Sequence, residues 1–83
     1  MDKPQLQKQM ENLVSLPLVE VTGQSRVLIE NHKGILAYTP TEIQIGVSYG
    51  CIIVNGDDLQ IIQMSKAQLV ICGRIESVQL FGR

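Results

Sequence analysis

From Leu18 onward, apolar and polar residues alternate with a period of two, and short polar or glycine-containing stretches interrupt the pattern. In Glu42–Val47, for example, Ile43, Ile45 and Val47 fall on one face. Such alternation is typical of half-buried strands in antiparallel sheets. With turn signals at this spacing, the pattern predicts about seven or eight short strands.

Two segments of this region predict tight β-hairpins. Residues 26–39 form two apolar stretches joined by Asn31–Gly34, and Asn and Gly tolerate the positive φ angles of a short turn. Asn55–Asp58 begins with an Asn-Gly pair, so a second turn is expected there. Gly73 and Arg74 interrupt the last apolar stretch and mark a further turn or a bulge.

The N-terminal region has a different period. In Pro4–Leu16 four apolar residues share one face of a predicted helix, and Pro17 ends it. These apolar positions, which we call the N-terminal stripe, are Leu6, Met10, Leu13 and Val14. We expect this helix to cap an open end of the sheet, and the alternative is a docking helix for a partner.

Together these patterns predict an all-β fold, a small antiparallel sandwich or barrel-like meander with one N-terminal helix. Residues 1–17 form the helix and lead-in, and residues 18–83 form a single β domain. The chain has 83 residues with 45% hydrophobic but only 4% aromatic content, so aliphatic side chains must build the core. No helix lies between strands, which excludes a parallel βαβ architecture.

Charge and cysteine content narrow the function classes. A net charge of −1 without a basic block argues against nucleic-acid binding. The longest apolar run, Cys51–Val54, is too short for direct membrane insertion, and we expect a soluble, cytoplasmic protein. Cys51 and Cys72 lack metal-binding spacing, so we expect no metal or cofactor and two thiols buried like apolar side chains.

Candidate chemistry is sparse. His32, the only histidine, lies between Glu30 and Lys33 and could serve as a general base. The competing interpretation is an exposed turn residue whose ring bonds a backbone carbonyl. Arg74 and Glu76 are expected to form an exposed ion pair. Because no phosphate loop, nucleophile elbow or metal-ligand pair occurs, we do not expect an enzyme.

The strands themselves suggest association. Cys51–Val54 and Gln60–Met64 are apolar and uncharged, and few lysines guard the predicted strands. Exposed edges of a small sheet invite strand addition or self-assembly. The sequence therefore predicts a homo-oligomer through sheet edges or a protein partner.

Several motifs, in this order, resemble the YabP/YqfC family of sporulation proteins, and YqfC-like members more than YabP-like ones. The resemblance spans about residues 16–80, because the motifs follow one another at the family's spacing. The matching motifs are Leu16-Pro17, Ile29-Glu30-Asn31-His32-Lys33-Gly34, Tyr38-Thr39, Ser48-Tyr49-Gly50, Val54-Asn55-Gly56 and Gly73-Arg74-Ile75-Glu76-Ser77-Val78.

This resemblance implies a protein of the mother cell of endospore-forming bacteria, linked to spore maturation, including cortex or coat assembly. It also implies a YqfD-like membrane-anchored partner, which could hold the chain at the forespore membrane surface. The family has no established enzymatic activity, so no catalytic residues carry over. The candidate partner-contact or family-signature residues are Glu30, Asn31, His32, Lys33, Gly34, Gly73, Arg74 and Glu76.

Two functional hypotheses follow. The first is a non-enzymatic interaction module that docks on a membrane partner or self-assembles during spore maturation. The second is a ligand-binding or hydrolytic domain acting on cell-envelope material, with His32 and Glu30 as acid and base.

Overall fold

The computed structural model describes residues 16–82, which form a single six-stranded antiparallel sheet. The strand order across the sheet is β1-β2-β6-β5-β4-β3. Within residues 16–82 the sheet is not closed, because β1 and β3 each pair with one strand. The predicted N-terminal helix lies outside the described residues. The strands are β1 (Leu18–Thr22), β2 (Arg26–Glu30), β3 (Ile35–Tyr38), β4 (Glu42–Val47), β5 (Gly50–Met64) and β6 (Gln68–Gly82).

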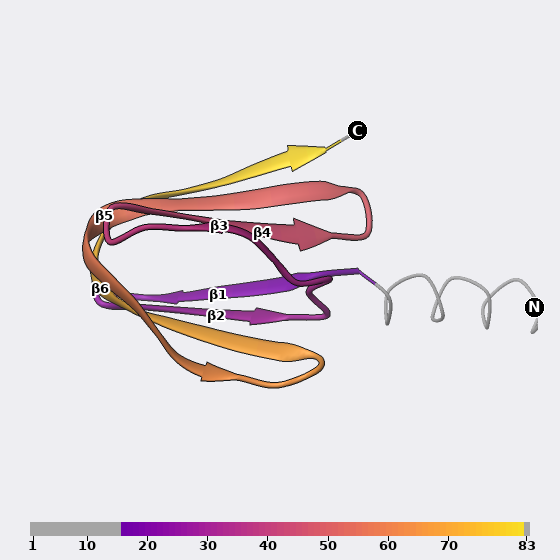
Figure 1. Cartoon of the computed structure of the whole chain (residues 1–83), viewed down its shortest axis with the longest axis horizontal. Helices are drawn as coiled ribbons and strands as arrows, with labels where there is room; N and C mark the ends of the chain where they lie inside the picture. The colour runs from indigo at the N-terminus through magenta and orange to yellow at the C-terminus, as the bar shows by residue number, and fades with distance from the viewer. Residues whose placement is uncertain (1–15, 83) are drawn as a thin grey trace, which may run out of the picture.

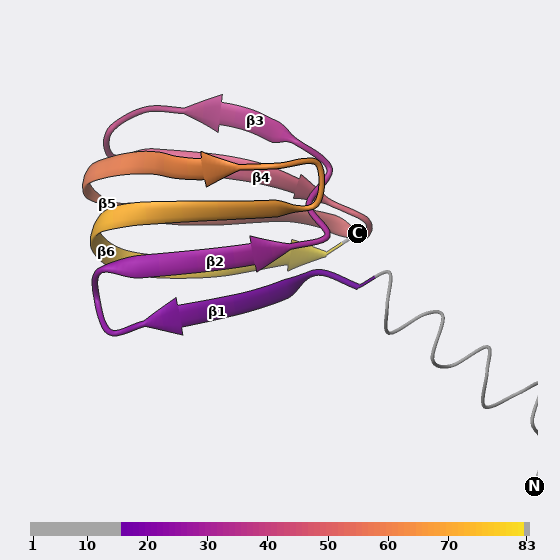
Figure 2. The ribbon, with the colours of Figure 1, turned by 90° about the horizontal axis from the view of Figure 1, so that it is seen from below.

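The sheet folds over into a two-layered sandwich because β5 and β6, with 15 residues each, run through both layers. In one layer β4 pairs with residues 50–55 of β5, which also pair with residues 77–82 of β6. In the other layer β2 pairs with residues 68–72 of β6. Figure 1 shows the layers joined at one end by the bends of β5 and β6, and Figure 2 shows β1, β2, β6 and β5 side by side in one layer. The all-β fold is confirmed.

The two bends correct the expected number of strands. The hairpin turn predicted at Asn55–Asp58 is wrong, since this segment continues β5 and pairs with β6 through register shifts. Gly73, with a φ of 140°, is the single β6 residue that lies opposite Asp58 and Leu59 at a bulge of β5. A side chain there would place its Cβ 2.6 Å from the carbonyl oxygen of Asp58. Four expected short strands therefore merge into two long ones, which gives six strands in the described chain.

The bulge in β5 also changes which residues face the core. Before the bend, Ile52, Val54 and Gly56 are buried, so even-numbered positions point inward. Asp58, which has a φ of 52°, and Leu59 both lie opposite Gly73, so β5 has one residue more than β6 at this point. After this bulge the inward positions are odd, and Leu59 is only 2% exposed. One additional residue thus keeps a carboxylate out of the core.

The loops of both outer hairpins hold the bends in place. In the β3–β4 loop, the carbonyl of Pro40 accepts a hydrogen bond from Leu59 N–H at 2.8 Å. In the β1–β2 loop, the carbonyl of Gln24 accepts one from Ile75 N–H at 2.7 Å. Since backbone groups left unpaired at a bulge are costly when buried, these loops stabilise the folded sheet.

The core between the layers is aliphatic, as the composition predicts. Its side chains are Ile, Val and Leu residues that alternate with polar ones along the strands. The β-branched Ile and Val also favour the strand conformation. The buried core residues are Val27, Ile29, Ile43, Ile45, Val47, Ile52, Val54, Leu59, Leu69, Ile71 and Ile75.

The hairpin predicted over residues 26–39 is also wrong. β2 pairs with β1 and β6, whereas β3 pairs with β4 at the other end of the sheet. Asn31–Gly34 is therefore the crossover from one layer to the other. Asn31 has the positive φ expected of a turn residue, 64°, but the chain turns away from β2 rather than back onto it.

Candidate functional site

The crossover loop, residues 31–34, is bound through its backbone to both layers. The N–H of Asn31 donates to the carbonyl of Ala67 at 2.7 Å, which fixes it to the β5–β6 turn. The N–H of Lys33 donates to the carbonyl of Gly46 at 2.7 Å, which fixes it to β4. The crossover loop therefore joins the two layers at the end of the sandwich opposite the bends.

His32 lies inside this loop and is 6% exposed, so the expectation of an exposed turn residue is wrong. Its Nδ1 accepts a hydrogen bond from Gly34 N–H at 3.0 Å. Its Nε2 lies 2.9 Å from the carbonyl oxygen of Ser65, as the expected carbonyl bond requires. A ring whose Nδ1 accepts and whose Nε2 donates is the neutral Nε2–H tautomer.

These bonds leave the acid–base hypothesis without support from His32. Both ring nitrogens are engaged by backbone groups, so neither is presented to a substrate. Glu30 is half-buried at the end of β2. Within residues 16–82, no three His, Cys, Asp or Glu side chains are grouped so that they could hold a metal ion.

Asn31 also uses its side chain structurally. Its Nδ2 donates a hydrogen bond to the carbonyl oxygen of Leu16 at 2.8 Å. This bond ties the segment before β1 to the crossover loop. The loop therefore sets where the chain enters the sandwich.

The remaining candidate residues, Gly73, Arg74 and Glu76, lie at the bend of β6, at the other end of the sandwich from the crossover loop. Arg74 forms the expected ion pair with Glu76, at 3.4 Å, and a second one with Asp57, at 3.1 Å. All three side chains are exposed, and exposed pairs contribute little to stability. The eight candidate residues therefore do not converge on one site: five lie at the crossover and three at the bend.

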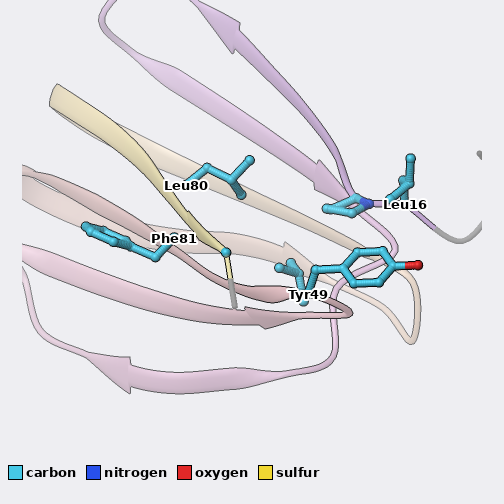
Figure 3. Close-up of a pocket in the computed structure, with 7 residues that line it drawn as sticks. Leu16, Tyr49, Leu80 and Phe81 are labelled. Carbon is cyan, nitrogen blue, oxygen red and sulfur yellow. The ribbon is translucent and has the colours of Figure 1, made fainter.

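The structure instead reveals an apolar groove of about 310 Å³ at the open end of the sandwich (Figure 3). None of its residues was among the eight candidate partner-contact residues expected from the sequence. A turn carrying an aromatic side chain and two consecutive apolar residues near the end of the last strand were the available signals. The groove residues are Leu16, Pro17, Val47, Tyr49, Leu80, Phe81 and Gly82.

Leu80 shows that the groove is an uncovered part of the inner face. It pairs with Ile52, and side chains of directly opposite residues in a sheet point to the same face. Ile52 is fully buried in the core, yet Leu80 is 66% exposed. The core-facing surface of β6 therefore continues beyond the part that the opposite layer covers.

A second apolar surface lies along the edge formed by β3 and the second half of β5. The Tyr38 hydroxyl accepts a hydrogen bond from Ile61 N–H at 3.3 Å, which places the two strands beside each other. We call the exposed apolar residues here the edge surface: Leu36, Tyr38, Ile62 and Met64. Of the two uncharged segments, only the second is thus left open, since Ile52 and Val54 are buried.

Two further findings concern the thiols and the membrane. Cys51 and Cys72 are free and half-buried, rather than fully buried as expected. Within residues 16–82 the structure has no helix of the length and hydropathy needed to cross a bilayer.

Comparison with known proteins agrees with the motifs. The model of the YabP family matches residues 17–82. An uncharacterized protein of Bacillus subtilis strain 168, YqfC, is 25% identical over 67 residues, which cover 81% of this chain and 72% of that protein. No solved structure matches the chain significantly. Since the family model covers nearly the whole described fold, the resemblance is confirmed, and the chain belongs to the YabP family.

Proposed function

We propose that this chain is a non-enzymatic interaction module of sporulating cells, acting in the mother cell during cortex or coat formation. It docks on a membrane-anchored, YqfD-like partner at the forespore membrane surface. Membership of the YabP family supports this setting, because the resemblance implies a role in spore maturation. The observation that carries the interaction role is the edge surface.

The edge surface combines unpaired backbone groups with exposed apolar side chains. Among the described residues β3 forms strand pairs only with β4. Toward the second half of β5 it has the bond between the Tyr38 hydroxyl and Ile61 N–H, so a further strand would add to β3 beside this bond. Its sequence, Ile35–Tyr38, carries no charge to block such pairing. Ile62, 57% exposed, extends the apolar surface from the neighbouring strand. Exposed apolar patches of this kind mark protein-binding sites.

Some of the candidate residues stabilise the fold, and others are available for contact with a partner. Asn31, His32 and Gly34 form hydrogen bonds that hold the crossover loop in place. The Lys33 side chain is exposed, and so is that of Arg74 at the other end. We assign partner contact only to such exposed side chains, as a charged rim around an apolar centre.

Capture of the detergent-solubilised YqfD-like protein by the tagged chain tests this role. Leu36→Lys places a charge on edge strand β3 and is expected to abolish capture, because edge lysines block strand addition. Thr22→Lys places the same charge on β1, the opposite edge, and is expected to leave capture intact. Circular dichroism confirms that both variants fold. Undiminished capture by Leu36→Lys contradicts the proposal.

Light scattering over a concentration series distinguishes the self-assembly alternative. A mass that stays at one chain supports a module dedicated to the partner. A mass that rises with concentration, and that Leu36→Lys returns to one chain, assigns the edge surface to self-assembly.

A further inference from the structure

The apolar groove is a part of the sandwich interior that residues 16–82 leave without a cover. Leu80 points to the same face as the fully buried Ile52, yet it is 66% exposed. Leaving such inner-face side chains in water forfeits the stabilisation that burial gives them.

We propose that the N-terminal stripe of the same chain occupies this groove and completes the core. The stripe consists of Leu6, Met10, Leu13 and Val14, four apolar residues whose spacing would place them on one face of a helix, in the segment that precedes the described residues. This assignment concerns the groove and is independent of the edge surface.

The place where the described chain begins supports this occupant. Leu16 lines the groove, and its carbonyl is held by the Asn31 side chain at 2.8 Å. Val14, the last residue of the stripe, is two positions before Leu16. The segment therefore starts at the rim of the groove, and so short a connection gives it a high effective concentration there.

The chemistry of the groove also fits the stripe. No charged side chain lines the groove, and the only polar side-chain group among its residues is the Tyr49 hydroxyl. The stripe is likewise without charge, whereas Lys8 and Glu11 lie between its members. An amphipathic segment of this pattern buries its apolar face in an apolar groove and leaves its charges in water.

Methyl NMR of the full chain tests the proposal. The chain has three methionines, so selective methyl labelling of Met and Leu makes Met10 easy to assign. The expected result is a set of nuclear Overhauser effects from the Met10 methyl to the Leu80 methyls and the Tyr49 ring. Diluting the labelled chains with unlabelled ones separates the two origins. Effects within one chain keep their intensity per labelled chain, whereas effects between chains weaken.

Two variants provide the matched comparison. Met10→Glu places a carboxylate on the stripe and is expected to shift the Leu80 methyl signals and to increase the binding of a hydrophobic dye. Asn12→Glu adds the same charge off the stripe and is expected to change neither. Effects found only between chains would assign the groove to a second copy and overturn the proposal. A folded chain without any effect from Met10 to the groove also overturns it.

Discussion

The Nδ2 of Asn31 donates a hydrogen bond to the carbonyl oxygen of Leu16 at 2.8 Å, across 15 positions of sequence. Asn31 is also the residue that starts the crossover between the layers, with a φ of 64°. A single side chain thus links the path of the chain between the layers to the rim of the apolar groove.

Replacing the Asn31 amide by a carboxylate tests how much the hydrogen bond to Leu16 contributes to stability. Asn31→Asp retains a residue that tolerates positive φ but removes the donor, so we expect a loss of about 1 kcal/mol of unfolding free energy. Urea denaturation measures it. Gln24→Glu makes the same chemical change in the exposed β1–β2 loop and is expected to have little effect. Equal stabilities of the two variants would show that the bond contributes nothing.

His32 is expected to be a structural residue. His32→Ala removes two hydrogen bonds and leaves backbone groups unpaired, which should cost about 1–3 kcal/mol of unfolding free energy. Lys33→Ala, at the next and exposed position, should change it by about 0.5 kcal/mol or less. Denaturation curves of the two variants decide this. A His32→Ala variant as stable as the wild type, but unable to bind its partner, would instead make His32 a contact residue.

The tautomer of His32 provides an independent test. Long-range proton–nitrogen correlation spectra of the neutral ring should show the proton on Nε2, because Nδ1 accepts from Gly34 N–H. A proton on Nδ1 would contradict the hydrogen bonds of the crossover loop.

Gly73 is expected to be essential to the bend. In Gly73→Ala the new Cβ meets the carbonyl oxygen of Asp58 at 2.6 Å, and the φ of 140° is unfavourable for alanine. We expect a loss of about 3 kcal/mol or more. Gly23→Ala is the control, since its φ is also positive but nothing lies within 4 Å of the new Cβ. It should cost only about 1 kcal/mol, and equal losses in thermal or urea unfolding would argue against the close approach.

The bulge at Asp58 makes a prediction about register. Leu59 is 2% exposed and Ile62 is 57% exposed. Leu59→Ala should therefore cost about 2–5 kcal/mol, and Ile62→Ala about 0.5 kcal/mol or less. Without the extra residue the even positions would face inward and the order of the two losses would reverse. Comparing the two variants by urea unfolding distinguishes these registers.

The β-class of the fold, the aliphatic core and the positions of most strands could be predicted from the sequence. A period of two and a wealth of Ile, Val and Leu encode a strand locally, so no tertiary information is needed. The Arg74–Glu76 pair was predictable for the same reason, because residues two apart in a strand share a face.

Only the tertiary structure decided which strands pair and what the polar loops do. Asn31–Gly34 and Asn55–Asp58 both have the chemistry of tight turns, and the positive φ of Asn31 was correctly expected. Local dihedral preferences do not specify whether a chain turns back on its strand, crosses to another layer or continues as a bulged strand. Contacts distant in sequence made that choice: His32 with Ser65, and the β3–β4 loop with the bend of β5.

The apolar groove belongs to the same class of feature. Leu80 alternates like any core residue, yet it is 66% exposed, whereas its partner Ile52 on β5 is buried. Alternation in sequence reports which face a side chain occupies, whereas burial depends on what another part of the chain places over that face. The sequence therefore determined the direction of Leu80, and the tertiary structure alone decided that it lies in an open groove.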